Sequence, residues 1–481
     1  MISLRAALRD ATSDLHELDD DIAHVQAVLE DLRRKREALQ EFAIKHDAFL
    51  APIRQLPAEI LAEIFIYCMP NYGNSSFNPH FPPFLLGRVC IGWRQVASST
   101  QVLWSSITVN PYWPSHKMAK LWIERAISAP LTIHLDSTGP SREGPIQPAI
   151  AVLAQYCDRW KDLDIRIEET MVSRLNSIRH RLPWLETLRI QNPRESRLWC
   201  QSQELNIFEL APRLHNVSLA RGISHTSVKI PWNQLTELNV HAANFNECLE
   251  TLQLVPNLVK CTVYALSRFQ TASLPSQNSP VLTFSYLRSF SIFCLGPPEG
   301  IFRHLKLPII YAFHIACETD RHEDSWLSRQ SLMPLLSCSS HALRKLEIGR
   351  LIARDSAHIA WCLRATPWLA QLTLRGSEDW VTADLLRLFT RLPDIEVLVP
   401  DLEVLEISAR HIPCYECMSM IESRWRAPAS AQLKRLHIGL VSPEDWQMDV
   451  VKLLLKYRQE GMAISIITKG NRDLLETLCI T

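Results

Sequence analysis

The sequence predicts a mixed α/β chain in three parts, and three observations support this fold class. Apolar residues recur at steps of four and three along residues 4–39, apolar segments flank a polar loop in residues 52–108, and one short apolar motif repeats from about residue 120 onward. We expect a long coiled-coil helix over residues 1–50, a small all-α unit over 51–110, and an α/β horseshoe solenoid with a C-terminal cap over 120–481.

Composition and charge indicate a folded chain without a strong overall electric field. Of the 481 residues, 47% are hydrophobic and 21% are charged, and 51 Lys and Arg balance 51 Asp and Glu. Zero net charge gives no overall attraction to nucleic acid or to an anionic membrane, so we expect to find neither as a partner. The sequence contains no segment typical of a signal peptide or a membrane helix, and we therefore expect a protein of the cytoplasm, the nucleus or both.

The first part carries the 3.5-residue period of a coiled-coil seam, interrupted by Arg36. Its apolar positions are Leu4, Leu8, Ala11, Leu15, Leu18, Ile22, Val25, Leu29, Leu32 and Leu39. An acidic run at residues 19–21 and a basic run at 33–36 are interpreted as solvated faces rather than as a metal site or a nucleic-acid patch. So narrow a stripe needs a partner helix, from a second copy, from another protein or from its own chain folded back. Residues 4–39 are accordingly a candidate homodimer interface.

The third part repeats a motif whose first, fourth and sixth residues are apolar. The units start at Trp160, Leu185, Leu214, Leu235, Leu258, Leu287, Ile310, Leu343, Leu369, Leu402 and Leu433. Most starts are separated by about the 20 to 29 residues of a leucine-rich repeat, and several intervening helical segments end in proline. Stacked strand–helix units of this kind form a parallel sheet with an outer layer of helices. At the end of the array, Ser442, Pro443 and Asp445 predict the start of a capping helix that stops at Gly461.

Few motifs for chemistry are present. The sequence holds no glycine-rich phosphate loop, no HExxH and no GxSxG, so we predict no catalytic residues and no cofactor. The cysteines resemble reduced, buried apolar residues, apart from a CxxC pair at Cys414 and Cys417. Zinc at that pair requires further ligands, for which His411 and His437 are the nearest candidates, and our prediction is that no metal is bound.

Three blocks in the second part resemble the F-box. They are LPAEILAEIF at residues 56–65, VCIGWRQVA at 89–97 and LWSSI at 103–107, and family members show Leu-Pro-x-Glu-Ile-Leu, Val-Cys-x-x-Trp-Arg and Leu-Trp in that order. With a coiled coil before it and degenerate leucine-rich repeats after it, the chain resembles the large fungal family of F-box proteins of that layout. The resemblance covers nearly the whole chain, although only the F-box blocks are motif-specific. The polar insert at residues 71–84 departs from the usual F-box spacing.

The resemblance implies a non-catalytic substrate-recognition subunit of a Skp–cullin–F-box ubiquitin ligase. The F-box would dock on the Skp-type adaptor, and through it on a cullin, while the repeats hold a protein substrate. So many apolar residues cannot all face inward in so small a unit, which agrees with a docking surface. The residues carried over as contacting the adaptor or supporting that interface are Leu56, Pro57, Ile60, Leu61, Val89, Cys90, Trp93, Leu103 and Trp104. For Ile64, Phe65, Val96 and Trp104 a core role is the alternative.

The open face of the repeat sheet is the candidate substrate surface, because strand residues alternate between the two faces. The candidate substrate-binding residues are Arg189, Asn239, Tyr264, Phe293, His314, Glu347, Arg375, Glu406 and His437. The alternative is a merely solvated sheet face. Two other functions stay open: a non-catalytic scaffold that dimerises through its coiled coil and acts outside a ligase, and a zinc or redox role for Cys414 and Cys417.

Overall fold

The computed structural model divides into two compact units. The first comprises residues 1–70 and 79–103, and the second residues 71–78 and 104–481. Residues described in detail are 2–50, 52–54, 56–70, 80–111, 116–138, 146–166, 171, 173–193, 204–265, 280–295, 298, 301–318, 327, 329–352, 355–376, 379–392, 397–428, 432–441, 446–468 and 473–475.

The α-helices of the first unit precede those that accompany the sheet of the second unit. In the first unit they are α1 (Ile2–Leu50), α2 (Ala58–Tyr67) and α3 (Ile91–Ser99). In the second unit they are α4 (His116–Ala126), α5 (Ile146–Ala154), α7 (Phe245–Gln253), α8 (Arg329–Ser339), α9 (Ser356–Ala365), α10 (Ala383–Phe389), α11 (Cys414–Trp425) and α12 (Met448–Gln459). Within the described part of the chain, none of the helices is both long enough and apolar enough to cross a membrane.

One parallel sheet of 14 strands dominates the second unit, and its neighbouring strands follow the order of the chain. Its strands are β1 (Ser106–Val109), β2 (Leu131–Asp136), β3 (Trp160–Arg166), β4 (Thr187–Ile190), β5 (Asn216–Leu219), β6 (Glu237–Ala242), β7 (Lys260–Ala265), β9 (Ser289–Leu295), β11 (Ala312–Glu318), β12 (Lys345–Leu351), β13 (Gln371–Gly376), β14 (Val404–Ser408), β15 (Arg435–Val441) and β16 (Ala463–Thr468). A separate two-stranded sheet pairs β8 (Leu282–Thr283) with β10 (Leu305–Lys306).

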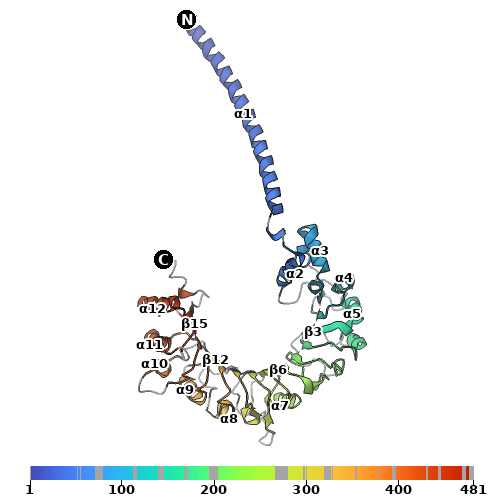
Figure 1. Ribbon diagram of the computed structural model, residues 1–481, viewed down its shortest axis with the longest axis vertical. Helices are drawn as coiled ribbons and strands as arrows, with labels where there is room; N and C mark the ends of the chain where they lie inside the picture. Colours follow the sequence, from blue (N-terminus) through green and yellow to red (C-terminus); the bar gives the residue numbers. More distant parts are fainter. Residues whose placement is uncertain are drawn as a thin grey trace. The chain divides into compact units, whose positions relative to one another are not determined.

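The apolar motif forms the strands because its residues alternate between a buried and a solvated face. On β3, for example, Trp160, Leu163 and Ile165 are all buried. Parallel neighbours require a crossover connection, which leaves the connecting segments on one side of the sheet. Figure 1 shows that the sheet of the second unit is curved, with the strands on the inner side of the curve and helices such as α7, α9 and α11 on its outer side. The strands predicted from the motif are therefore confirmed at β3 to β7, β9 and β11 to β15.

The sheet extends beyond the predicted repeats at both ends. Strand β1 pairs with β2 from Ser106 opposite Thr132 to Val109 opposite Leu135, so the sheet begins before residue 120 and within the range expected to be all-α. Ile107 and Val109 are buried and alternate with half-exposed residues. That period of two is enough for a strand although the longer motif is missing. At the other end β16 pairs with β15.

The C-terminal capping helix is α12, and it stops where the sequence predicts. Gly461 has φ of +106°, a left-handed conformation that suits glycine. Its N–H donates to the carbonyl of Arg458 at 3.2 Å, and the N–H of Met462 donates to the carbonyl of Tyr457 at 3.1 Å, which together form a Schellman motif. The predicted starting residues Ser442, Pro443 and Asp445 lie outside the described residues, and the described helix follows Gln447.

The long N-terminal helix predicted over residues 1–50 is present as α1, which has 49 residues. Its described apolar seam residues Leu8, Leu15, Leu18, Ile22, Val25, Leu29, Leu32 and Leu39 are between 46% and 69% exposed. This exposure leaves the apolar stripe open to a partner helix.

Candidate functional site

Helices α2 and α3 of the first unit pack through an aromatic contact. Phe65 is fully buried, and its ring centroid lies 4.9 Å from that of Trp93 with the planes inclined at 57°. Cys90 caps α3, because its Sγ accepts the backbone N–H of Trp93 at 3.4 Å. Pro57 precedes α2, where its missing N–H costs nothing, and Glu59 lies in the first turn. These contacts hold the two helices in one arrangement.

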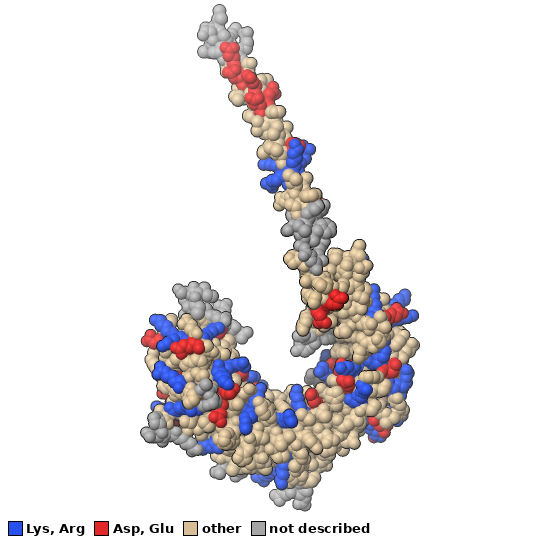
Figure 2. Space-filling view, viewed as in Figure 1, with Lys and Arg blue, Asp and Glu red and all other residues tan. Residues whose placement is uncertain are grey.

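The same helices, and Val89 two residues before α3, leave apolar side chains in solvent. The exposed fractions are 48% for Ile60, 36% for Ile64, 55% for Val89 and 72% for Ile91. Ile60 and Ile64 are four residues apart and therefore lie on one side of α2. Figure 2 shows a mostly uncharged surface over α3, with an acidic patch beside it at α2. We call these four residues the docking residues, because exposed apolar groups of this kind mark sites of protein interaction.

The predicted adaptor residues fall into three classes of exposure. Pro57, Ile60 and Val89 are exposed, Leu56, Cys90 and Trp93 are half-buried, and Leu61, Leu103 and Trp104 are buried. Trp104 packs edge-on against Trp122 at 5.0 Å, and the guanidinium of Arg125 lies 4.2 Å from its ring centroid. Leu61, Leu103 and Trp104 are thus core residues, which for Trp104 is the alternative expected from the sequence. Ile91 was not among the residues predicted from the sequence. The available signal was its spacing from Val89, because residues two apart at the start of a helix do not face the same side and cannot both be buried there.

In the second unit, half-exposed side chains form rows across the inner face of the sheet. On β6 these are Glu237, Asn239 and His241, which alternate with buried residues. In-register pairing places Asn239 opposite Thr262 on β7, and Thr262 opposite Ser291 on β9. The central row defined by this pairing is Arg189, Ser218, Asn239, Thr262, Ser291, His314, Glu347, Thr373, Glu406 and His437.

The predicted substrate residues all lie on this inner face. Arg189, Asn239, His314, Glu347, Glu406 and His437 belong to the central row. Tyr264, Phe293 and Arg375 lie two residues further along their strands, in the next row. The register thus brings neighbouring members close together, while Arg189 and His437 lie on strands β4 and β15, far apart in the strand order.

Stacked rings form an aromatic row in the middle of this face. The ring of His241 stacks on Tyr264 with centroids 4.5 Å apart, and Tyr264 stacks on Phe293 at 4.8 Å. Phe293 in turn meets His314 edge-on at 4.7 Å. Burial, and then the nearby charge of Arg221, lower the pKa of His241. Tyr264, Phe293 and His314 were predicted from the sequence as surface residues, whereas His241 was not.

Two polar atoms beside the aromatic row lack a hydrogen-bond partner among the described residues. They are Oδ1 of Asn239 and Nδ1 of His241, and both are shielded from solvent. A buried polar atom without a partner costs about 1 to 3 kcal/mol. Because neither atom is open to solvent, neither is available to a ligand on the inner face.

An ion network adjoins the aromatic row. Arg375 on β13 lies between two glutamates, with Nη1 3.5 Å from Oε1 of Glu347 and Nη2 3.4 Å from Oε2 of Glu406. Glu347 also lies 3.5 Å from Nε2 of His314. The pKa of His314 is lowered by burial, against the opposing charge of Glu347 and with help from Arg375 and Lys345. Two carboxylates thus face the guanidinium of Arg375, and the charge of Lys345 also acts on His314.

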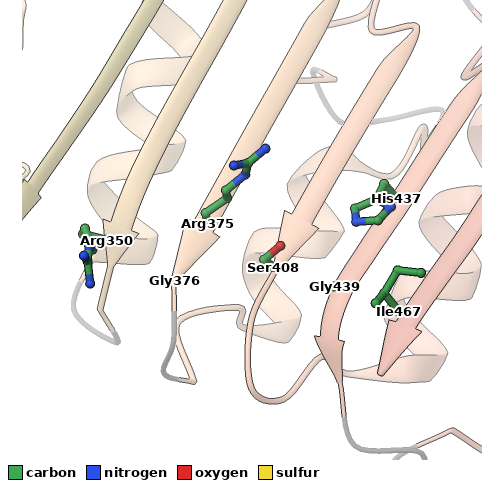
Figure 3. A pocket seen from close by; sticks show the side chains of 7 residues that line it. All are labelled: Arg350, Arg375, Gly376, Ser408, His437, Gly439 and Ile467. Carbon is green, nitrogen blue, oxygen red and sulfur yellow. The ribbon is translucent and has the colours of Figure 1, made fainter. Parts of the chain in front are cut away.

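A hollow opens next to this network (Figure 3). Its cavity volume is about 410 Å³, and its lining residues are Arg350, Arg375, Gly376, Ser408, His437, Gly439 and Ile467. The strand residue at position 439 has to be glycine for this arrangement to fit. A Cβ atom on Gly439 would lie only 2.8 Å from Oγ of Ser408. Arg375 and His437 were predicted from the sequence, and the other lining residues were not. For Gly376 and Gly439 the available signal was a glycine inside a strand, which often marks a close approach of the backbone.

The CxxC cysteines lie at the start of α11. Cys417 is fully buried, and desolvation raises the pKa of its thiol to about 12, whereas Cys414 is half-buried. So high a pKa keeps the Cys417 thiol protonated and weakens it as a metal ligand or nucleophile. Across the described ranges, His, Cys, Asp and Glu form no group of three or more that could hold a metal.

No model of a known protein family matches the chain. No curated protein matches it significantly.

Proposed function

We propose that the chain is a substrate-recognition subunit of a Skp–cullin–F-box ubiquitin ligase. The motif residues at 56–65 and 89–97 cover most of α2, the first seven residues of α3 and the two residues before each helix. The observation that carries the proposal is that this part of the first unit leaves Ile60, Ile64, Val89 and Ile91 in solvent. The α1 helix precedes the F-box, and the repeats form the leucine-rich-repeat horseshoe that holds the substrate.

The docking residues supply enough apolar area for a partner. Fully burying an aliphatic side chain contributes about 1.5 to 3 kcal/mol, so four of them offset a large part of the cost of association. The Phe65–Trp93 contact fixes these side chains before the adaptor arrives, which lowers the ordering cost of binding. Leu61 and Leu103, both buried in the first unit, support the backbone that presents them.

Co-purification with a Skp-type adaptor tests the proposal. We expect the wild-type chain to retain the adaptor, and expect the paired changes Ile60→Glu and Val89→Glu, or Leu56→Ala and Pro57→Ala, to abolish retention. Leu254→Glu is a matched control, because Leu254 is an exposed apolar residue of the second unit. A wild-type chain that ignores the adaptor would disprove the assignment.

The inner face is the proposed substrate surface, with the aromatic row at its centre. Rings stacked on neighbouring strands offer apolar contact area at little cost in side-chain entropy, and the adjacent ion network adds charge specificity. We expect Tyr264→Ser with Phe293→Ser to remove substrate proteins from those captured with the full chain, while the adaptor stays bound. Tyr286→Ser, a change at an exposed ring outside the row, is the control. Unchanged capture by the double variant would exclude the row as the binding surface.

The exposed seam of α1 favours a second candidate, a scaffold that dimerises and binds partners outside a ligase. Both candidates use the inner face for binding, and neither requires chemistry from this chain. Ubiquitylation of a captured partner in a reconstituted ligase separates them. Transfer that depends on Ile60 and Val89 supports the first candidate, and adaptor-independent partner binding without transfer supports the second.

A further inference from the structure

The α1 helix carries a regular heptad pattern over its described side chains. If Leu8 is assigned to heptad position a, Ala11 is d, and the seam continues in order to Leu39 at d and Ala43 at a. Positions e and g flank the seam and face a partner helix. Charged flanking residues are Asp14, Asp19, Asp21, Arg33 and Lys35, and all of them are exposed.

Charge is segregated along the same helix. Figure 2 shows an acidic segment toward the N-terminal end of α1 and a basic segment further along. The acidic segment is Asp10, Asp14, Glu17, Asp19, Asp20 and Asp21, and the basic segment is Arg33, Arg34, Lys35 and Arg36. A helix with this distribution is complementary to itself only when the second helix runs in the opposite direction.

We infer that α1 pairs with α1 of a second copy of this chain as an antiparallel coiled coil centred near Ala27. In this register every a position lies against a d position of the second copy. Val25 meets Leu29, Ile22 meets Leu32 and Leu15 meets Leu39. Arg36, the charged interruption of the seam, then faces Leu18 and lies next to Asp19 of the second copy.

Flanking charges select this arrangement. In an antiparallel pair, e faces e and g faces g. The e positions place Asp19 against Arg33, and the g positions place Asp21 against Lys35, each pair occurring twice by symmetry. At the centre Gln26 faces Gln26 and Val28 faces Val28, so no like charges meet. Lys35 already forms an exposed ion pair with Asp31 of its own helix at 2.7 Å, and such a pair leaves the ammonium free to share a second carboxylate.

A parallel pair of the same helix is disfavoured by the same residues. In that arrangement a faces a, which places Arg36 against Arg36 inside the seam. Position g faces the following e, which places Asp14 against Asp19 twice. Like charges at these positions destabilise a coiled coil, and a basic residue facing its own copy in the seam adds a desolvation cost. The charge pattern therefore determines the direction of the pair as well as the identity of the partner.

Charge reversal in the full-length chain tests both parts of this inference. Asp19→Lys with Asp21→Lys makes both flanking segments basic, and Arg33→Glu with Lys35→Glu makes both acidic. We expect each double variant to weaken self-association by at least about tenfold, because four attractive pairs become repulsive. An equimolar mixture of the two variants, and the combined fourfold variant, are expected to associate as the wild type does. Sedimentation equilibrium measures each case.

Outward-facing charges supply the matched control. Asp20 and Arg34 occupy position f, so Asp20→Lys with Arg34→Glu makes the same kind of change away from the seam and is expected to leave association unchanged. Circular dichroism checks that every variant retains the helix. A monomeric wild type overturns the inference. Tighter association of the Asp19→Lys, Asp21→Lys variant also overturns it, because that change relieves the Asp14–Asp19 repulsion of a parallel pair. All of the changes lie in α1, away from the docking residues, so the result does not depend on adaptor binding.

Discussion

The ring of Phe65 on α2 lies 4.9 Å from the ring of Trp93 on α3, inclined at 57°. The two rings connect the two motif blocks that the sequence places more than twenty residues apart. Phe65 is buried, while Ile60 and Ile64 on the same helix are exposed. One face of α2 therefore holds the small unit together, and another is left for a partner.

The first prediction concerns this contact. Phe65→Ala should destabilise the packing of α2 against α3 by about 3 to 5 kcal/mol, because a large buried ring is removed and a cavity remains. Hydrogen exchange measures the effect as faster exchange of the α2 and α3 amides. Tyr67→Ala is the control, since Tyr67 is 86% exposed on the same helix. Equal exchange in the two variants would show that the ring contact does not hold the unit.

The second prediction concerns the buried guanidinium of Arg424. It donates from Nε to the carbonyl of Phe389 at 2.7 Å, from Nη2 to that of Leu398 at 2.8 Å and from Nη1 to that of Val399 at 3.1 Å. Arg424→Met should cost about 3 kcal/mol or more, because several buried carbonyls lose their donor. Arg424→Lys should not restore stability, since one ammonium lacks the planar fork of donors.

Thermal unfolding measures the loss at Arg424. Arg426→Met is the control, because Arg426 is an exposed partner of Glu422 at 2.6 Å, and such a pair contributes about 1 kcal/mol or less. Burial lowers the pKa of Arg424 to about 9, and the three carbonyls offset part of that desolvation. If Arg424→Met and Arg426→Met melt together, the carbonyl contacts are not stabilising.

The third prediction concerns thiol reactivity. Cys68 and Cys338 are exposed, whereas burial raises the pKa of Cys248, Cys362 and Cys417 to about 12. A thiol reacts as its thiolate, so an alkylating reagent should modify Cys68 and Cys338 in the native chain and the other three only after unfolding. Mass spectrometry of the timed reaction gives the order. Native modification of Cys417 as fast as Cys68 would restore the redox alternative.

The fourth prediction concerns acid. The pKa of His241 and that of His314 are lowered in the folded chain, chiefly by burial. As the pH falls below about 6.5, the unfolded chain takes up these protons first. The contribution of the two histidines to the free energy of unfolding is therefore complete above that pH. It is lost as the pH falls toward their pKa values in the folded chain. The urea midpoint should be lower at about pH 5 than at about pH 7.

His241→Phe isolates the contribution of one ring. The change keeps a ring to stack on Tyr264 and removes the titration, so it should reduce the drop in midpoint between the two pH values. The exposed His341, changed in the same way, is the control. A drop that is equally large in the His241→Phe variant would assign the acid sensitivity to other groups.

The strands of the central sheet were predictable because burial on one face fixes a period of two. Each repeated motif, such as Leu235 with Leu238 and Val240, lies at a strand of the structure. Strands β1, β2 and β16 were missed because they keep the alternation without the longer motif. The α1 helix was predictable from its seam, although the helix extends past the last seam leucine to Leu50.

Site residues were harder to predict, since side-chain type does not determine exposure. Leu61 and Ile60 are adjacent and equally apolar, yet only the second is exposed, because helix rotation directs Leu61 inward. Trp104 belongs to the block at residues 103–107 that resembles the F-box, but it packs against Trp122. The hollow depends on glycines of β13 and β15 lying beside Ser408, a relationship that only strand register creates.

Hydrogen exchange of the full chain with and without a purified Skp-type adaptor tests the central claim most directly. The claim is that α2 and the start of α3 form the adaptor-binding surface. We expect the adaptor to slow exchange of amides around Ile60, Ile64 and Ile91, and expect strands β6 to β14 to exchange as before. Protection confined to the sheet of the second unit, or no protection anywhere, would contradict the account.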